Sequence, residues 1–239
     1  MPKPSSRLWV IDPVTADDIS ALWLTLQLAI ATTLLLLAVG LPLAWWLSRT
    51  RFAGKPVIEA IVALPLVLPP TVLGFYMLTL LNPSSPIGQL WVTVTGESLT
   101  FSFSGLVLAS FFYSLPFMIQ PLQSGFENAT LKPMQLAYSY GVHPFRAFFT
   151  IALPVAWRSV LTAIILSFAH TIGEFGVVLM VGGNIPGETR VISIAIYEHV
   201  EATAYDQAGM LSLILLGASF AILFLVFLMN RRRPVYVPG

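Results

Sequence analysis

The residues best suited to chemistry in this sequence are one acid and one histidine inside an apolar stretch. Glu174 interrupts the apolar residues 159–180, and Gly173 and Gly176 flank it. His170 lies four residues before Glu174, so a continuous helix would place both side chains on one face, and we expect a hydrogen bond between them. This pair alone does not predict a metal site, because zinc takes at least three protein ligands.

The composition indicates that these residues lie within a membrane. Of the 239 residues, 56% are hydrophobic and only 10% are charged, whereas soluble domains carry about 25% charged residues. The chain is therefore expected to be an integral membrane protein. It has no cysteine, which excludes disulfide and thiol chemistry. The net charge of +1 points to no particular partner, and we expect no binding of nucleic acid.

Five stretches are long and apolar enough to cross the hydrocarbon core, which takes roughly 20 residues in a helix. They are residues 19–48, 60–81, 104–123, 159–180 and 207–230. Residues 82–103 are too polar to span and begin with Pro, Ser and Gly, so we expect a loop. The predicted fold is all-α: a polytopic membrane bundle of five transmembrane helices in a single domain, residues 1–239.

The distribution of basic residues predicts how the chain is oriented. An odd number of spans places the two termini on opposite sides. With the C-terminus in the cytoplasm, nine of the twelve basic residues face inward: Arg49, Arg51, Lys55, Lys132, Arg146, Arg158, Arg231, Arg232 and Arg233. The other three are Lys3, Arg7 and Arg190. We therefore expect the N-terminus outside and the C-terminus in the cytoplasm.

Two predicted spans contain candidates for a transport pathway or gate. An ionisable residue within a span usually faces the bundle interior or water. Breaks in a spanning helix are tolerated where they line a cavity or are covered by protein, and prolines interrupt the second span. The alternatives are a structural hydrogen bond that fixes a bend at Glu174 and a simple proline kink. The candidates are Pro69, Pro70, His170, Gly173, Glu174 and Gly176.

Residues 135–154, QLAYSYGVHPFRAFFTIALP, form a segment with marked proline and glycine punctuation on the predicted cytoplasmic side. Pro133 suits the start of a helix and Gly141 the position after its end, so residues 132–140 are expected to form a short helix. Residues 145–153 are expected to form a second one, which Pro154 stops or bends. The apolar side of this segment is too large to leave in water. An interfacial connector and a docking site for a partner are both compatible with it.

The same segment resembles the cytoplasmic motif of permease subunits of ATP-binding-cassette importers, E-A-A-x3-G-x9-I-x-L-P. Gly141 is followed by nine residues and then by Ile151, Ala152, Leu153 and Pro154, which matches the second half of the motif. In the first half, Gln135-Leu136-Ala137 stand where Glu-Ala-Ala is usual, so only Ala137 agrees. The polar contact made by the motif's Glu is therefore not expected here.

Two further stretches resemble the molybdate permeases of this family. These stretches are LPLVLPPTVLGFYMLTLL, residues 64–81, and GEFGVVLMVGGNIPGETRVISIAIY, residues 173–197. RFAGKP before the second span fits as well, and the resemblance covers roughly residues 20–230. Sulfate permeases share the G-E-[FY]-G part and a part similar to N-I-P.

The resemblance implies a homodimer of this subunit in the lipid of the bacterial cytoplasmic membrane. It also implies two cytoplasmic ATPase subunits, which bind the ATP, and an extracytoplasmic molybdate-binding protein. This chain is then a pore subunit and not itself an enzyme, and it needs no cofactor. Residues 126–154 would couple it to the ATPase. For Arg146 a contact with anionic lipid is an alternative. The coupling candidates are Gln135, Ala137, Gly141, His143, Arg146, Ile151, Leu153 and Pro154.

The residues themselves are compatible with this assignment. The sequence has no phosphate-binding glycine loop of the Walker type, so another chain would have to bind ATP. No Lys or Arg lies deep within a predicted span, although a dedicated buried anion site usually has such a charge. This pattern suits a pathway that leaves selectivity to a binding protein. Because an acid beside an anion pathway repels its cargo, Glu174 is not expected to bind the substrate directly.

Other functions remain open from the sequence. A permease for sulfate or tungstate belongs to the same class, and the sequence does not distinguish these oxyanions. A stand-alone secondary transporter or channel is a different class, but many secondary transporters carry inverted repeats, and none is visible here. A membrane scaffold without transport activity is disfavoured by the coupling motif.

Overall fold

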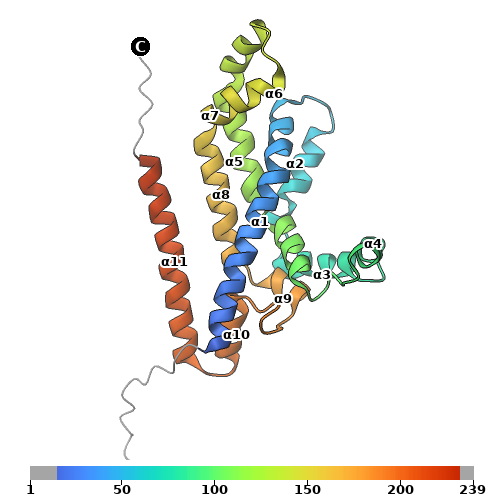
Figure 1. The fold of residues 1–239 in the computed structure, drawn as a ribbon, viewed down its shortest axis with the longest axis vertical. Helices are drawn as coiled ribbons and strands as arrows, with labels where there is room; N and C mark the ends of the chain where they lie inside the picture. The colour runs from blue at the N-terminus through green and yellow to red at the C-terminus, as the bar shows by residue number, and fades with distance from the viewer. Residues whose placement is uncertain (1–14, 232–239) are drawn as a thin grey trace, which may run out of the picture.

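The computed structural model describes residues 15–231, which form a bundle of α-helices without β-strands in that range. Four long helices run along the bundle: α1 (Ala16–Arg49), α5 (Phe103–Ser139), α8 (Trp157–Ile172) and α11 (Tyr205–Arg231) (Figure 1). The shorter elements are α2 (Lys55–Ala63), η1 (Leu64–Leu66), α3 (Pro70–Leu81), α4 (Pro86–Thr95), α6 (Pro144–Ala147), η2 (Phe148–Ala152), α7 (Leu153–Val155), α9 (Gly176–Gly182) and α10 (Ile192–Glu201). The prediction of an all-α membrane bundle is confirmed.

Three helices in the described range are long and apolar enough to cross a membrane alone: α1, residues 103–127 of α5, and residues 205–225 of α11. Two bent pairs raise this number to five if each pair counts as one span. Residues 55–66 and 70–81 meet at 112°, and residues 144–155 and 157–172 meet at 75°. The first of these bends lies at the proline break predicted at Pro69 and Pro70.

The loop predicted for residues 82–103 is partly wrong, because α4 occupies its centre. Ser85 caps this helix by accepting a hydrogen bond from the N–H of Gly88 at 2.9 Å, and Pro86 follows in the first helical position. Gly96 ends the helix in the left-handed conformation, with φ of 77°. These are ordinary start and stop signals. The predicted loop therefore contains a short helix that is not long enough to span.

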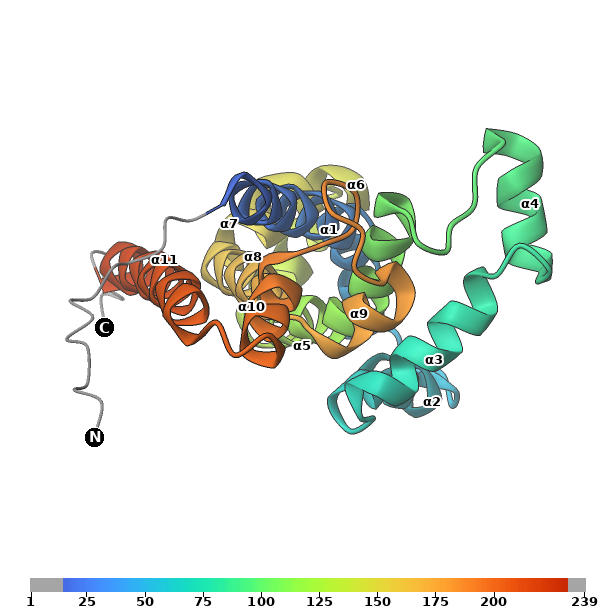
Figure 2. The same ribbon diagram turned by 90° about the horizontal axis from the view of Figure 1, so that it is seen from below.

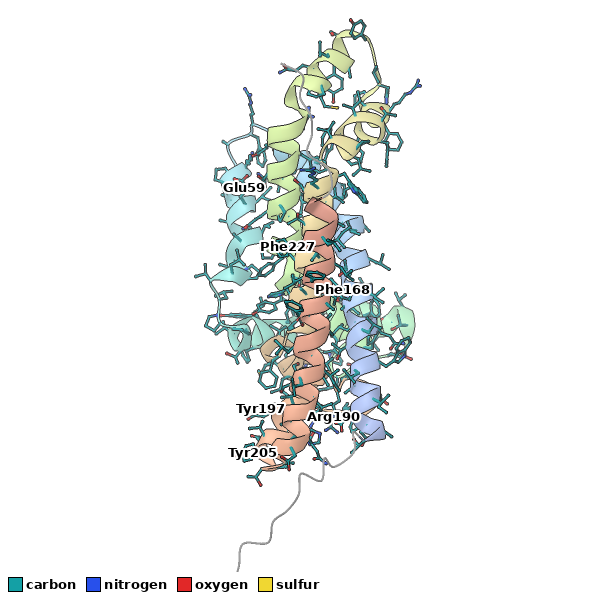
Figure 3. The ribbon with its side chains drawn as sticks, turned by 90° about the vertical axis from the view of Figure 1, so that its left-hand side faces the viewer. Glu59, Phe168, Arg190, Tyr197, Tyr205 and Phe227 are labelled. Carbon is teal, nitrogen blue, oxygen red and sulfur yellow. The ribbon has the colours of Figure 1, made fainter. Side chains whose placement is uncertain are left out.

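The helices are spread unevenly around a central group of α1, α5 and α8. α11 lies on one side of this group and α2, α3 and α4 lie toward the other (Figure 2). The core between α1, α5 and α8 includes Leu36, Met118 and Val160. Many large apolar side chains of α11 are exposed, among them Phe220 and Phe227, and Figure 3 shows α11 standing in front of the bundle. In a membrane such side chains face lipid or another protein.

The first turn of α1 is fixed by a capping box that also holds α10. Asp18 accepts a hydrogen bond from the backbone N–H of Thr15 at 2.9 Å, and the Asp18 N–H donates back to the Thr15 hydroxyl at 3.2 Å. The second carboxylate oxygen of Asp18 lies 2.9 Å from Nε2 of His199 on α10. Asp18 is buried. One side chain thus completes the cap at the start of α1 and ties α1 to α10.

Replacing Asp18 by Ala is expected to destabilise the fold by about 1–3 kcal/mol, because it removes both the cap and the partner of His199. Thermal unfolding of the purified protein in detergent measures the change. Asp17→Ala is the matched control, since Asp17 is an exposed acid in the same helical turn. Equal losses of stability in the two variants would contradict this role of Asp18.

Candidate functional site

The helix of the fourth predicted span breaks at the residues singled out from the sequence. α8 ends at Ile172, and the N–H of Gly173 caps it on the carbonyl oxygen of Ala169 at 3.3 Å. Glu174 and Phe175 follow before α9 begins. The prediction of one span over residues 159–180 is therefore wrong: α8 pairs with residues 144–155 across a bend, and residues 176–182 form a separate helix.

α9 is held close to α3 by two glycines. A Cβ atom at Gly176 would lie 2.8 Å from Cβ of Pro70, and one at Gly74 would lie 2.7 Å from Cβ of Met180. Real Cβ atoms do not approach other carbon atoms this closely, so a side chain at either position would force the two helices apart. The start of α3 and the start of α9 are thereby placed beside the break after α8.

A cavity of about 550 Å³ lies at this break, lined by residues of α3, α5, α8 and α9. Five of the six pathway candidates line it: Pro70, His170, Gly173, Glu174 and Gly176. The sixth, Pro69, precedes α3 and is not part of the lining. The structure adds two polar residues, Thr71 and Tyr113. No sequence signal pointed to Tyr113, because only the packing of α5 against α8 and α9 brings it to the cavity.

Glu174 occupies an unusual position in this cavity. It is 4% exposed, and neither of its carboxyl oxygens has a hydrogen-bond partner within residues 15–231. The hydroxyl of Ser110 approaches it from α5 but does not meet hydrogen-bond geometry. The backbone of Glu174 does have a partner, since the Ser193 hydroxyl of α10 donates to the Glu174 carbonyl oxygen at 2.5 Å. The loop is therefore anchored while its carboxyl group is left without a partner.

The predicted hydrogen bond between His170 and Glu174 is wrong. The helix ends between the two residues, so the spacing of four does not place them on one face. Nδ1 of His170 instead lies 2.9 Å from the hydroxyl of Ser114, and its ring stacks on Phe117 with 4.0 Å between ring centres. The ring of Tyr113 lies 4.6 Å from that of His170. These contacts fix the imidazole from the side of α5.

The hydroxyl groups around His170 determine which of its nitrogens carries a proton. Thr171 donates its only hydroxyl proton to the carbonyl oxygen of Ser167 at 2.9 Å. The 3.1 Å contact between Ser114 and Thr171 must then use the proton of Ser114. Ser114 is left to accept from Nδ1–H of His170. This ordered chain of donors fixes the ring and occupies Nδ1.

A second candidate site lies at the end of the bundle where α11 also ends (Figure 1). Instead of the predicted separate helix over residues 132–140, α5 continues unbroken to Ser139 and contains three prolines: Pro116, Pro121 and Pro133. Each of these prolines removes one hydrogen bond, but the neighbouring turns maintain the helix. The first part of the predicted cytoplasmic segment is thus the projecting end of a long helix.

The turn after α5 forms as the sequence predicts. Gly141 has φ of 74°, and its N–H donates to the carbonyl oxygen of Tyr138 at 3.0 Å. The N–H of Val142 donates to the carbonyl oxygen of Ala137, also at 3.0 Å, which completes a Schellman cap. His143 then caps α6 by accepting a hydrogen bond from the N–H of Phe145 at 3.4 Å. We call residues 135–149 the tip.

The tip exposes several large apolar side chains. Tyr140 is 84% exposed and Phe145 is 70% exposed, while Phe148 is buried against the core. An apolar cavity of about 550 Å³ is lined by residues of the tip and by Leu41 and Trp45 of α1. Among the coupling candidates, Gln135, Gly141, His143, Arg146 and Pro154 are exposed, Ala137 is buried, and Ile151 and Leu153 pack against the core.

The fold and these two sites define a class of membrane transport subunit. A solved bacterial alginate ABC transporter, in complex with an alginate-bound periplasmic protein, aligns with a TM-score of 0.75 at 17% identity, covering 91% of this chain and 80% of that one. The sequence of residues 37–232 matches the family described as binding-protein-dependent transport system inner membrane component. This chain belongs to that family.

Two relatives within this family are permeases that are named for their substrates. The molybdenum transport system permease protein ModB of Azotobacter vinelandii is 52% identical over 219 residues, which cover 92% of this chain and 97% of the relative. A probable sulfate transport system permease protein, cysT of Zygnema circumcarinatum, is 32% identical over 219 residues, which cover 91% of this chain and 74% of the relative. The chain is thus similar to molybdenum permeases over nearly its whole length, and to sulfate permeases less closely.

In the described part of the chain, no three His, Cys, Asp or Glu side chains lie close enough together to hold a metal ion. The tip exposes an apolar surface, and the cavity in the bundle is a mostly apolar pocket with a few polar side chains in its lining.

Replacing Gly141 by Ala is expected to destabilise the tip by about 1 kcal/mol, because an L residue is strained at this positive φ. Proteolysis of the turn between α5 and α6, compared with wild type, measures local opening of the tip. Gly209→Ala is the control, because Gly209 is helical and a Cβ there would meet nothing within 4 Å. Greater cleavage in the control than in Gly141→Ala would contradict the turn geometry.

Proposed function

We propose that this chain is the transmembrane permease subunit of an ATP-driven importer that carries molybdate across the bacterial cytoplasmic membrane. The 52% identity to a molybdenum permease along almost the full length of both chains carries this proposal. The family match and the fold similarity to a solved ABC transporter support it. Residues 1–239 then act as a single permease domain, and residues 126–154 act as its coupling segment.

ATP is bound and hydrolysed by a partner in this proposal, and the permease itself carries no cofactor. The absence of a Walker-type glycine loop from the sequence supports this division. The tip is the surface best suited to the cytoplasmic ATPase subunits, because exposed aromatic groups such as Tyr140 and Phe145 gain most from burial in a partner. His143 and Arg146, both exposed on the tip, add polar contacts.

The orientation follows from the charges at the two ends of the bundle. The end of α1 (Arg49), the start of α2 (Lys55), Arg51 between them, α6 (Arg146) and the start of α8 (Arg158) belong to the end of the bundle with the tip (Figure 1). Arg190 lies at the other end (Figure 3). Lys3, Arg7, Arg232 and Arg233 lie outside the described residues, and the side chains of Lys132 and Arg231 are not described. The positive-inside rule places the tip and the C-terminus in the cytoplasm and the N-terminus outside.

The outer end then receives an extracytoplasmic molybdate-binding protein. The loop before α10 is well built for such a contact. Arg190 forms a 2.8 Å ion pair with Glu198 of α10, and Asn184 donates to the same carboxylate at 2.9 Å. The solved transporter with its periplasmic protein supports this kind of assembly. A preformed loop loses little conformational freedom when a partner docks.

A second copy of the chain completes the permease in this proposal. Large apolar side chains are exposed on the side of α2 and α3, among them Ile61, Val67 and Phe75, and also along α11. A homodimer would bury one such face, and membrane lipid would cover the other. A thin wall of five spans also needs a partner to enclose a pathway for an oxyanion.

Reconstitution tests the function and separates it from sulfate or tungstate transport. The permease, its ATPase and its binding protein are placed in vesicles with ATP on the ATPase side. Uptake of radiolabelled molybdate is expected to require all three components, and it should exceed sulfate uptake. Uptake without the ATPase would indicate a secondary transporter instead. Faster uptake of sulfate would assign the chain to the sulfate permeases, which the 32% identical relative represents.

The docking surface is tested by removing apolar groups from the tip. Tyr140→Ser and Phe145→Ser together are expected to weaken ATPase binding by tenfold or more, on the order of the loss of one interface hot spot. Because both side chains are exposed in this chain, its own fold should not change. Val94→Ser on α4 is the matched control, an exposed apolar residue outside the tip. Pull-down titration measures the affinity, and unchanged binding would remove the tip from the interface.

A further inference from the structure

Glu174 lines the cavity between α3, α5, α8 and α9, and its buried carboxyl group has no hydrogen-bond partner in the part of the chain that the structure describes. Buried polar groups in native proteins are nearly always satisfied, so an orphan carboxyl in a cavity needs an explanation. Glu174 is one of the residues that line the cavity, but its two carboxyl oxygens are enclosed by the protein. A ligand in the cavity becomes the missing partner when the carboxyl group turns toward it.

The charged state of this group follows from its surroundings. No Lys or Arg from any of the helices around it lines the cavity in the described range, and the titratable neighbours are Tyr113 and His170. An ionised carboxylate that is buried without a cation or a hydrogen bond costs several kcal/mol. The neutral acid avoids this penalty. A neutral carboxyl group carries one O–H donor.

Two further residues that carry hydroxyl groups line the same cavity. They are Tyr113 of α5 and Thr71 in the first turn of α3. With Glu174, residues that can donate a hydrogen bond through a hydroxyl group come from α3, α5 and the α8–α9 loop to one space. A ligand that only accepts hydrogen bonds, such as a tetrahedral oxyanion, is complementary to this arrangement.

We propose that this cavity is a transient binding site for the transported tetrahedral oxyanion, and that the neutral carboxyl group of Glu174 donates a hydrogen bond to one of its oxygens. The proposal rests on the proposed function, because it presumes that the chain conducts an oxyanion. It also removes the objection that an acid repels an anion, since repulsion requires the ionised form. Neutral donors hold a dianion without a fixed positive charge, and this allows the release that conduction requires.

The volume of the cavity fits this role. At about 550 Å³ it lies within the range of small-molecule sites, roughly 300–1,000 Å³. An oxyanion can therefore enter with part of its hydration shell. The protein then replaces only some of the water molecules around the oxyanion. Weak binding of this kind lets the anion leave the site again.

The test compares Glu174→Gln with Glu174→Ala in the complete complex of permease, ATPase and binding protein. Gln is neutral, nearly isosteric and keeps an N–H donor, so oxyanion uptake is expected to stay within about threefold of wild type. Ala has no donor, so uptake is expected to fall by roughly tenfold or more, the loss of one hydrogen bond to a charged ligand. ATP hydrolysis stimulated by the binding protein should persist in both variants, which a collapsed fold would not allow.

Ser110→Ala is the matched control, because this buried hydroxyl lies beside Glu174 but does not line the cavity. Oxyanion uptake by the complex with Ser110→Ala should equal that of wild type. Loss of uptake in Glu174→Gln as large as in Glu174→Ala would show that an ionised carboxylate is needed and would overturn the proposal. Normal uptake in Glu174→Ala would do the same. Failure of the wild-type complex to take up molybdate, tungstate or sulfate would instead refute the proposed function, whatever the variants do.

Discussion

The close approach of α3 to α9 is the contact on which the rest of the bundle interior depends. Gly74 and Gly176 let the two helices meet at a distance that no larger residue permits. This contact fixes the start of α9 and holds the loop that carries Glu174 against the end of α8. The backbone of Glu174 is anchored there, while its carboxyl group is buried without a hydrogen-bond partner among residues 15–231.

Much of the fold could be predicted from the sequence, because the signals that start, break and end helices act within a few residues. The apolar stretches gave the helical class, the prolines gave the break before α3, and Gly141 gave the turn at the tip. The sequence did not reveal that α5 continues through Pro133, because tertiary packing supports the helix beyond its local propensity. The pairing of His170 with Ser114 was also missed, since it joins residues 56 apart in the sequence.

The two candidate sites share one helix. α5 presents Tyr113 to the cavity, holds His170 through Ser114, and continues to the turn that forms the tip. Near the tip it is also tied to α2, where Lys55 lies 3.2 Å from Glu127 and Gln123 donates to Glu59 at 2.6 Å. In the proposed permease, a displacement imposed at the tip would reach the cavity along this one helix of 37 residues, about 55 Å long.

The three prolines within α5 give this connection a particular mechanical character. A proline has no N–H, so the carbonyl oxygens of Phe112, Phe117 and Ala129 cannot accept the usual bond from four residues later. A helix that lacks such bonds is more compliant at those points than elsewhere along its length. Two of these positions, the turns before Pro121 and Pro133, lie between Tyr113 at the cavity and the end of α5 at the tip. In the proposed permease, a force applied to the tip would bend α5 at these positions before it reached the cavity.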